Sequence, residues 1–369
     1  MSTPDASPLP ISTVSDAAVA TGDLAEALAD RVRDASARRA PLRIVGGDTK
    51  AFLGRRTDGE PLEMSCHRGV IAYDPSELVI TARAGTPITE VEAQLAERGQ
   101  MLAFEPPVLG ETSTLGGVVA AGLAGPRRPF AGAIRDSVLG VTVLNGRGAA
   151  LRLGGTVFKN VAGFDGFRLM AGAMGSLGVL LDVSLRVSPV AAAEASRSLE
   201  LGWPAARTLI TGLMRRPLPL TGAAHDGGRL HLRFAGAPQS VAAITAEVGG
   251  EETAEAFWQD LRHRRPPLFA APRLWRLSVP RTAELGEPPG EWLRDWAGGE
   301  IWLGSDAPAE RVRTLATDAG GHATLYRGAA PDEQVFTPLP APMLTLHQRL
   351  KAAFDPAGVF NPGRVYEGL

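Results

Sequence analysis

The stretch RIVGGDTK (43–50) leads a short apolar strand, LRIV (42–45), directly into two consecutive glycines. Because glycine has no side chain, successive backbone N–H groups can turn toward one point and approach a ligand closely, which makes a nest for an anion. Thr49 adds a hydroxyl donor and Lys50 adds a positive charge. The stretch therefore predicts a loop for a pyrophosphate, with an ordinary strand-ending turn as the alternative.

Two more glycine-rich stretches follow, TSTLGGVVAAGLAG (112–125) and KNVAGFDGFRLMAGAMGSLGVLL (159–181). In the first of these, glycines stand among small apolar residues. That composition suits close passage of the backbone along a flat ligand, or a tightly packed helix or loop. The second contains G-x-x-G-x-x-G and precedes a strand, whereas a Rossmann site needs G-x-G-x-x-G at the start of a helix. The sequence has no Walker A motif, which argues against an NTPase.

Apolar and alternating runs predict the strands around these stretches. We expect strands at 42–45, 69–73, 78–84, 101–104 and 177–189, and a β-hairpin over 141–153. The hairpin is predicted from Asn145-Gly146, a pair that favours a tight turn between strands. The long strand should end at Pro189, because proline cannot donate a hydrogen bond to a sheet.

Two helices are predicted in the N-terminal half. The first begins at Asp23 and Glu26, which are spaced like a capping box. The second opens at Thr86-Pro87 and closes at Gly99. The residues expected on the buried faces are Leu24, Leu28 and Val32 in the first helix and Ile88, Val91 and Leu95 in the second.

The C-terminal half has a different character. Residues 190–198 are rich in alanine and read as a linker, and all six tryptophans fall between 200 and 340, which predicts a separate core there. A last helix carries an apolar face and runs into the turn-rich tail FDPAGVFNPGR (354–364). The residues expected on that face are Met343, Leu346, Leu350 and Phe354.

Length and composition limit the possible functions. A chain of 369 residues is long enough for two domains, and a net charge of −2 gives no field for holding a nucleic acid. The single cysteine, Cys66, excludes an intrachain disulfide and a cluster held by four thiolates; it is either a reactive thiol or a stray one. The six histidines show no metal-binding spacing, and no apolar run reaches the ~20 residues that span a bilayer. The basic cluster at 262–265 is either a docking site or a solvated face.

In this order and spacing, the three glycine stretches resemble the FAD-binding domain of the vanillyl-alcohol oxidase/p-cresol methylhydroxylase (PCMH) superfamily. AIRDSVLGVTVLNGRG (133–148) resembles its central hairpin, MGSLGVLLDVSLRVSP (174–189) its closing strand, and the tail its C-terminal motif. Within that superfamily, GTVFKNVAGFDGFRLMAGAMGSLGV (155–179) is most similar to the FAD-binding E subunits of glycolate oxidases (glycolate dehydrogenases).

The resemblance implies an α+β fold with a PCMH-type FAD-binding domain of two α/β subdomains at 1–190. A smaller α+β cap domain at 191–340 follows, and the helix and NPGR tail at 341–369 return to the FAD domain. We expect the three glycine stretches to meet so that their main-chain amides grip a diphosphate beside a planar ring. The residues implied to bind the cofactor are Val45, Gly46, Gly47, Asp48, Thr49 and Lys50 in the pyrophosphate loop, Pro106, Thr114, Gly116, Gly117 and Gly122 in the second loop, Lys159 and Gly163 in the third segment, and Gly178 and Val179 in the turn on the adenine side.

Two departures from the superfamily pattern matter. Covalent members carry a histidine in the first loop, where this chain has Asp48, so the resemblance implies non-covalent FAD. Full-length 2-hydroxy-acid dehydrogenases carry a metal motif resembling H-x-G-D-G-N-x-H and a glutamate where this chain has Met174. Neither feature is present here, and no catalytic residue or metal ligand is assigned.

The sequence therefore predicts an FAD-dependent oxidoreductase subunit of a glycolate (2-hydroxy acid) oxidase complex, which passes on electrons from hydroxy-acid oxidation. The resemblance implies two partners, a larger FAD-binding subunit and an iron–sulfur subunit, and a cytoplasmic location that can include the inner face of the cell membrane within the complex. Two alternatives stay open: a self-contained FAD oxidoreductase for another alcohol or acid, and a structural subunit without flavin.

Overall fold

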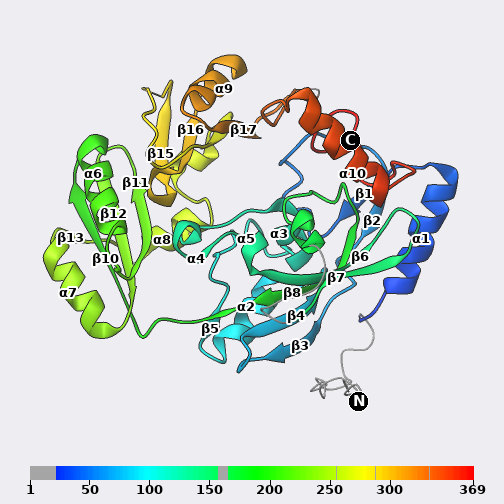
Figure 1. Ribbon diagram of the computed structural model, residues 1–369, viewed down its shortest axis with the longest axis horizontal. Helices are drawn as coiled ribbons and strands as arrows, with labels where there is room; N and C mark the ends of the chain where they lie inside the picture. The colour runs from blue at the N-terminus through cyan, green and yellow to red at the C-terminus, as the bar shows by residue number, and fades with distance from the viewer. Residues whose placement is uncertain (1–21, 157–164, 255, 287, 332) are drawn as a thin grey trace, which may run out of the picture.

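A computed structural model describes residues 22–156, 165–254, 256–286, 288–331 and 333–369 (Figure 1). Within these ranges the strands form a five-stranded sheet, an eight-stranded sheet and two small two-stranded pairs. The five-stranded sheet is antiparallel and has the order β3-β4-β8-β6-β7. Its strands are β3 (Val70–Asp74), β4 (Val79–Arg83), β6 (Val138–Leu144), β7 (Ala150–Gly154) and β8 (Val179–Arg186).

The N-terminal helix packs beside a small parallel pair, β1 (Leu42–Val45) and β2 (Glu60–Glu63). Helix α1 (Ala25–Arg38) buries Leu28 and Val32, as the sequence predicts. It starts later than expected, however, because the Asp23 side chain accepts a hydrogen bond from the Ala25 N–H at 3.0 Å and Leu24 occupies the N-cap position.

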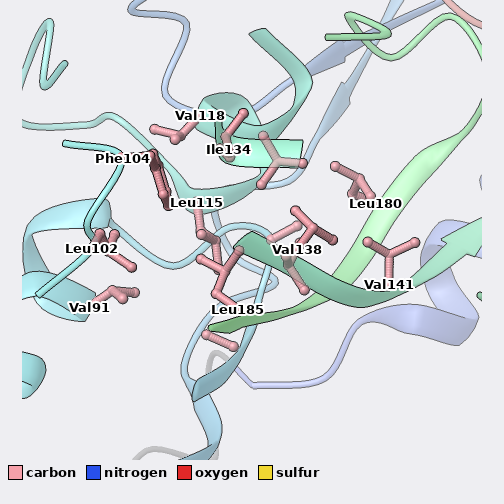
Figure 2. Packing of buried hydrophobic residues seen from close by; sticks show 14 of the residues in the cluster. Val91, Leu102, Phe104, Leu115, Val118, Ile134, Val138, Val141, Leu180 and Leu185 are labelled. Carbon is pink, nitrogen blue, oxygen red and sulfur yellow. The ribbon is translucent and has the colours of Figure 1, made fainter. Parts of the chain in front are cut away.

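The core of this half lies between the five-stranded sheet and short helices (Figure 2). Helix α2 (Ile88–Ala96) buries the predicted face, with Pro87 at the N-cap position. The predicted strand at 101–104 is only two residues long, β5 (Gln100–Met101), which pairs with β9 (Ser188–Pro189); Leu102 and Phe104 are buried in the loop after it. The remaining elements are α3 (Leu115–Ala121), α4 (Arg128–Ala131), α5 (Ile134–Ser137) and a 3₁₀ helix at Gly166–Met170.

The hairpin is present, but its turn is longer than the Asn-Gly pair predicts. Leu144 pairs with Ala150, which leaves five residues in the loop. The Asn145 side chain accepts from the N–H groups of Arg147 and Ala149, both at 3.0 Å. Asn145 thus stabilises a wider turn through its side chain.

The eight-stranded sheet is formed entirely by residues 193–327 and is antiparallel throughout. Its order is β13-β10-β12-β11-β15-β16-β14-β17. The strands are β10 (Ala193–Glu200), β11 (Leu220–His225), β12 (Arg229–Gly236), β13 (Glu251–Glu252), β14 (Leu274–Ser278), β15 (Glu291–Asp295), β16 (Glu300–Gly304) and β17 (His322–Arg327). The helices of this half are α6 (Trp203–Met214), α7 (Pro238–Val248), α8 (Ala256–Arg262) and α9 (Ala309–Asp318), with 3₁₀ helices at Pro267–Ala270 and Trp296–Gly298.

Two expectations for the C-terminal half are wrong. Residues 190–198 are no linker, because Ala193–Glu200 is a strand paired along its whole length with β12. Small alanine and serine residues do not favour a strand on their own, so tertiary pairing decides this segment. Trp296 does not belong to a separate core either: it is buried in the core of the five-stranded sheet, and its indole N–H donates to the Gly125 carbonyl at 3.0 Å.

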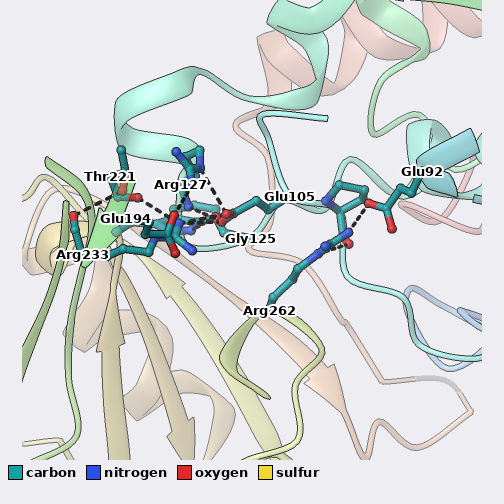
Figure 3. A network of polar contacts seen from close by, with 10 residues as sticks. Glu92, Glu105, Gly125, Arg127, Glu194, Thr221, Arg233 and Arg262 are labelled. Carbon is teal, nitrogen blue, oxygen red and sulfur yellow. Dashed lines mark hydrogen bonds and ion pairs between the residues drawn. The ribbon is translucent and has the colours of Figure 1, made fainter. Parts of the chain in front are cut away.

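Charged side chains join the two halves (Figure 3). Glu105, on a loop of the first half, accepts from Arg127 Nε at 3.1 Å and from Arg233 of β12 at 3.0 Å. Burial by itself would raise the pKa of Glu105, but Arg233 and Arg127 together hold it below its usual value. Arg262 of α8 also pairs with Glu92 of α2.

The last helix, α10 (Ala341–Phe354), leads from the eight-stranded sheet back to the first half, where its C-terminal part packs. Only part of its predicted apolar face is covered. Leu350 and Phe354 pack against the first core, whereas Met343 and Leu346 are 43% and 57% exposed.

Candidate functional site

A pocket with about 1020 Å³ of empty space, counted to its open mouth, lies between the loop after β1, helix α3 and the segment leading into β8. Apart from single residues at 57, 64 and 84, its lining comes from residues 43–51, 114–121 and 170–180, together with Asn361 and Arg364 of the tail. The three glycine stretches therefore meet, as the sequence predicts, at least for the described part of the third.

The first and second stretches lie in direct contact at Gly46 and Gly47. A Cβ atom on Gly47 would lie 1.5 Å from the carbonyl oxygen of Thr112, and one on Gly46 would lie 2.4 Å from Thr114 Oγ1. The Thr112 hydroxyl donates to the Gly47 carbonyl at 2.8 Å. The close contact between the loops therefore requires glycine at both positions, whether or not a ligand is bound.

The loop after β1 offers unused donors to the pocket. Asp48 has a φ of +52°, a left-handed conformation that turns neighbouring N–H groups toward one side. Within the ranges that the structure describes, the N–H groups of Gly47, Asp48, Thr49 and Lys50 donate to no protein acceptor. Because all four residues line the pocket, the loop can receive an anion.

Lys50 adds a positive charge, and no carboxylate in the part of the chain that the structure describes compensates it. Its ammonium group lies 3.3 Å from Thr49 Oγ1 and 3.4 Å from Ser113 Oγ, and it forms no ion pair with a described residue. Burial lowers the pKa of Lys50 to about 8. An anionic ligand would raise this pKa again, because a nearby opposite charge favours the protonated form.

The second stretch differs from the expectation, because its amides are already in use. The N–H of Leu115 donates to Thr86 O at 2.8 Å and that of Gly116 to Ala84 O at 2.7 Å. Thr114 caps α3 by accepting from the Gly117 N–H at 3.2 Å. This stretch therefore gives the pocket a wall of small residues, and the N–H groups of Leu115, Gly116 and Gly117 already have protein acceptors.

The third wall is the segment before β8. Met174 and Gly175 have left-handed backbones, with φ values of +50° and +72°. Met170, Ala173 and Leu180 add apolar surface on the same side. Together with Ala84 and Ala120 they make much of the pocket apolar, while the charged groups gather near the loop after β1.

Most of the predicted cofactor residues line this pocket. They are Val45, Gly46, Gly47, Asp48, Thr49, Lys50, Thr114, Gly116, Gly117 and Gly178. Lys159 and Gly163 lie outside the described residues.

Three of the predicted residues are not part of the lining. Pro106 faces the other half of the molecule, where its carbonyl accepts from Arg262 Nε at 3.0 Å. Gly122 ends α3 with a φ of +66° and packs on Gly172. Val179 is fully buried in a core shared with α1.

Sequence reasoning missed several lining residues, above all Asn361 and Arg364. The tail motif was expected to return to this half, but its side chains were not assigned to the site. The Arg364 guanidinium donates to the carbonyls of Lys50 at 3.3 Å and Ala51 at 3.0 Å. The FNPGR motif at 360–364 is the signal that could have found them.

The described residues contain no group of three or more His, Cys, Asp or Glu side chains placed to hold a metal ion. Among them there is also no helix with the length and apolar character needed to cross a membrane.

Comparison with known proteins agrees with this arrangement. The FAD binding domain family matches residues 17–154. The chain is 47% identical to glycolate oxidase subunit GlcE of Escherichia coli (strain K12) over 348 aligned residues. This alignment covers 94% of the chain and 99% of GlcE.

More distant relatives match only part of the chain. A D-lactate dehydrogenase of Anaerostipes hadrus is 35% identical over 32% of this chain and 25% of its own length.

Among solved structures, an alkyldihydroxyacetonephosphate synthase is similar with a TM-score of 0.63 and 17% identity, covering 91% of this chain and 74% of that one. This last likeness concerns the fold alone, and it confirms the predicted α+β class.

Proposed function

The chain belongs to the family of FAD-binding glycolate oxidase subunits that includes GlcE, and from this premise we propose that it holds FAD in the pocket beside residues 46–50. It is an FAD-linked oxidoreductase subunit of the glycolate (2-hydroxy acid) oxidase type. Its role in such a complex is to pass on electrons that come from hydroxy-acid oxidation.

One observation carries this proposal: unused N–H donors and a lysine with no carboxylate partner among the described residues lie together in an open pocket that also has apolar walls. FAD has a diphosphate that needs donors and positive charge, and a flat ring that needs apolar walls. Residues 47–50 fit the first requirement, and the apolar surface of Ala84, Ala120 and Leu180 fits the second.

Bound FAD would supply the electron-transfer chemistry, while the protein binds and orients it and excludes water. Gly47, Asp48, Thr49 and Lys50 are the residues we assign to the diphosphate. The carboxylate of Asp48 pairs with Arg43 at 3.3 Å, so its charge is partly offset beside the anion.

We propose that the flavin is held without a covalent bond. Asp48 stands where covalent superfamily members have a histidine, and neither histidine nor cysteine is among the described residues that line the pocket. Retention of FAD would then depend entirely on hydrogen bonds, charge and packing.

We propose the domain limits 1–190, 191–340 and 341–369, with the last segment belonging to the FAD domain. We also infer two partner chains, a larger FAD-binding subunit that provides the hydroxy-acid site and an iron–sulfur subunit that receives electrons. The presence of only one cysteine supports this inference, because a cluster held by four thiolates must belong to another chain. Assembly with these partners would place the chain at the inner face of the cell membrane.

The first test is purification of the chain from cells that supply FAD. We expect a yellow protein with about one FAD per chain, and release of all flavin on acid precipitation. A protein that remains colourless after incubation with FAD would contradict the proposal and favour a flavin-free structural role. Flavin that stays with the precipitated protein would contradict the non-covalent assignment.

The second test separates a subunit from a self-contained enzyme. Glycolate and an artificial electron acceptor are added to the isolated, FAD-loaded chain, and then to the chain with the polypeptides that co-purify with it. We expect turnover only in the assembled state. Full activity of the isolated chain would overturn the assignment as a dependent subunit.

A further inference from the structure

The C-terminal tail runs along β1 as an extra backbone partner (Figure 1). The N–H of Leu42 donates to Val359 O at 2.7 Å, and the N–H of Asn361 donates back to Leu42 O at 3.0 Å. Strand β1 is therefore paired with β2 on one side and with the tail on the other. Because the loop at 46–50 leaves directly from this strand, the tail supports the site that we assign to the diphosphate.

Asn361 connects two walls of the pocket through its side chain. Its Oδ1 accepts from the N–H of Ile44 at 2.8 Å, and its Nδ2 donates to the carbonyl of Met174 at 2.7 Å. Ile44 precedes the loop at 46–50, and Met174 begins the left-handed turn of the third wall. Both polar ends of the amide are thus engaged by protein backbone, so Asn361 acts on a ligand through these two walls.

The turn at 174–178 packs tightly against the Asn361 side chain. A Cβ atom on Gly175 would lie 2.6 Å from Asn361 Nδ2 and 3.2 Å from Ile44 Cδ1. Asn361 itself is only 5% exposed and adopts a φ of +39°, a region that asparagine tolerates better than most residues. The close fit means that replacing this side chain changes the spacing between the two walls.

A buried lysine of α10, Lys351, anchors the tail to the third wall of the pocket. The Lys351 ammonium donates to Ser176 O and Phe360 O, both at 2.7 Å, and to Asp355 Oδ2 at 2.8 Å. Asp355 Oδ2 in turn accepts from the N–H of Phe360 at 2.7 Å. Helix α10 is therefore anchored to the third wall and the tail together, which fixes Asn361 in place.

We propose that Asn361 is a positioning residue that sets the spacing between the anion-binding loop and the turn at 174–178, so that FAD affinity requires a docked C-terminal tail. This inference rests on the proposed function. It also implies that the chain acquires FAD only after its last residues have been made and have folded onto β1.

The test compares two substitutions of Asn361 in the full-length chain. Asn361→Leu removes both side-chain hydrogen bonds, whereas Asn361→Asp keeps the acceptor for Ile44 N–H and loses the donor to Met174 O. The matched control is Asp74→Ala, which removes the side-chain bonds to the N–H groups of Ser76 and Glu77 between β3 and β4, away from the pocket and from the tail. Each protein is stripped of flavin, checked for folding by circular dichroism, and titrated with FAD well below its Tm.

We expect both Asn361 variants to remain folded and to bind FAD at least about tenfold more weakly than the wild type, with a changed visible spectrum of the bound flavin. The Asp74 control should lose thermal stability but keep wild-type FAD affinity. If Asn361→Leu does not fold, Asn361→Asp alone decides the outcome. Wild-type affinity in a folded Asn361→Asp protein would overturn the inference, whereas a wild-type protein that binds no FAD would overturn the proposed function instead.

Discussion

At the scale of single residues, Lys50 is a binding group whose burial destabilises the flavin-free protein. Its ammonium group is buried beside two hydroxyl groups and has no carboxylate partner among the described residues. Burial therefore lowers its pKa to about 8. The same desolvation that destabilises the charged lysine strengthens its interaction with an anion, because less water competes for it.

FAD affinity should fall as the pH rises above about 8. In the flavin-free protein Lys50 is protonated below this pKa and neutral above it, whereas a bound diphosphate favours the protonated form. Binding above the pKa must therefore take up a proton, which weakens it as the proton concentration falls. The measurement is the Kd for FAD, by fluorescence, between about pH 6 and about pH 10.

Lys50→Met is the matched variant for this pH profile. Losing a charge-assisted contact of about 1.5–3 kcal/mol should weaken FAD binding roughly tenfold to a hundredfold and abolish the pH dependence. The flavin-free variant should also melt at a higher temperature than the wild type, since a desolvated charge is gone. A variant that retains the wild-type pH profile would show that another group titrates.

At the scale of elements, the contact between the loop after β1 and the start of α3 sets the shape of the pocket. The loops approach so closely at Gly47 that their backbones touch, while the first amides of α3 are taken up by Ala84 and Thr86. The glycines of the two stretches thus do different work. The glycines of the first stretch permit an anion nest. Gly116 in the second stretch permits α3 to lie against Ala84, which follows β4.

Gly47→Ala should disrupt this contact. The added methyl group would lie 1.5 Å from Thr112 O, a backbone atom, so one of the loops must move. We expect a loss of about 1–3 kcal/mol in unfolding free energy together with weaker FAD binding. Urea unfolding and FAD titration measure the two effects.

Gly212→Ala is the control for that substitution. Gly212 lies inside α6, and a Cβ atom there meets nothing within 4 Å. Alanine should therefore stabilise the protein by roughly 0.5–1 kcal/mol through its helix propensity, without affecting FAD. If Gly47→Ala behaves like this control, the tight contact between the loops does not govern the pocket.

At the scale of the whole molecule, Glu105 joins the half that contains the pocket to the eight-stranded sheet. It is buried between Arg127 and Arg233, which come from different halves (Figure 3). Trp296 reinforces the joint by inserting from the second half into the first core. The two halves therefore share both a charge network and apolar contacts.

Glu105→Gln should destabilise the protein by about 3–5 kcal/mol, because the buried guanidinium of Arg233 loses its carboxylate partner and the partly buried Arg127 keeps only its exposed pair with Glu194. Glu194→Gln, which affects an exposed pair with Arg127, should change stability by less than about 1 kcal/mol. Thermal and urea unfolding at neutral pH provide the comparison. Equal effects of the two substitutions would show that the Glu105 network does not join the halves.

The wild-type protein should lose this contribution in acid. The pKa of Glu105 in the folded state lies below its ordinary value of 4.5, so the contribution is complete above that value. It is lost as the pH falls through the lowered pKa of the folded state. Unfolding free energies measured down a pH series should therefore converge for wild type and Glu105→Gln.

The sequence by itself determined the features that depend on local chemistry. The strands at 42–45 and 78–84, the buried face of α2, and the three glycine stretches follow from periodicity and from the freedom of glycine, which neighbouring residues define. Those stretches also carried the resemblance that led to FAD. Ten of the predicted cofactor residues line the pocket for this reason.

Only the tertiary structure decided which backbone groups are used and which remain available. The amides of Leu115 and Gly116 are taken by residues about thirty positions earlier in the chain, and Asn361 reaches across more than three hundred positions to Ile44. Residues 193–200 become a strand because β12 pairs with them. Such contacts join residues far apart in sequence, and a hydrogen bond depends on distance and direction in space, which no local pattern specifies.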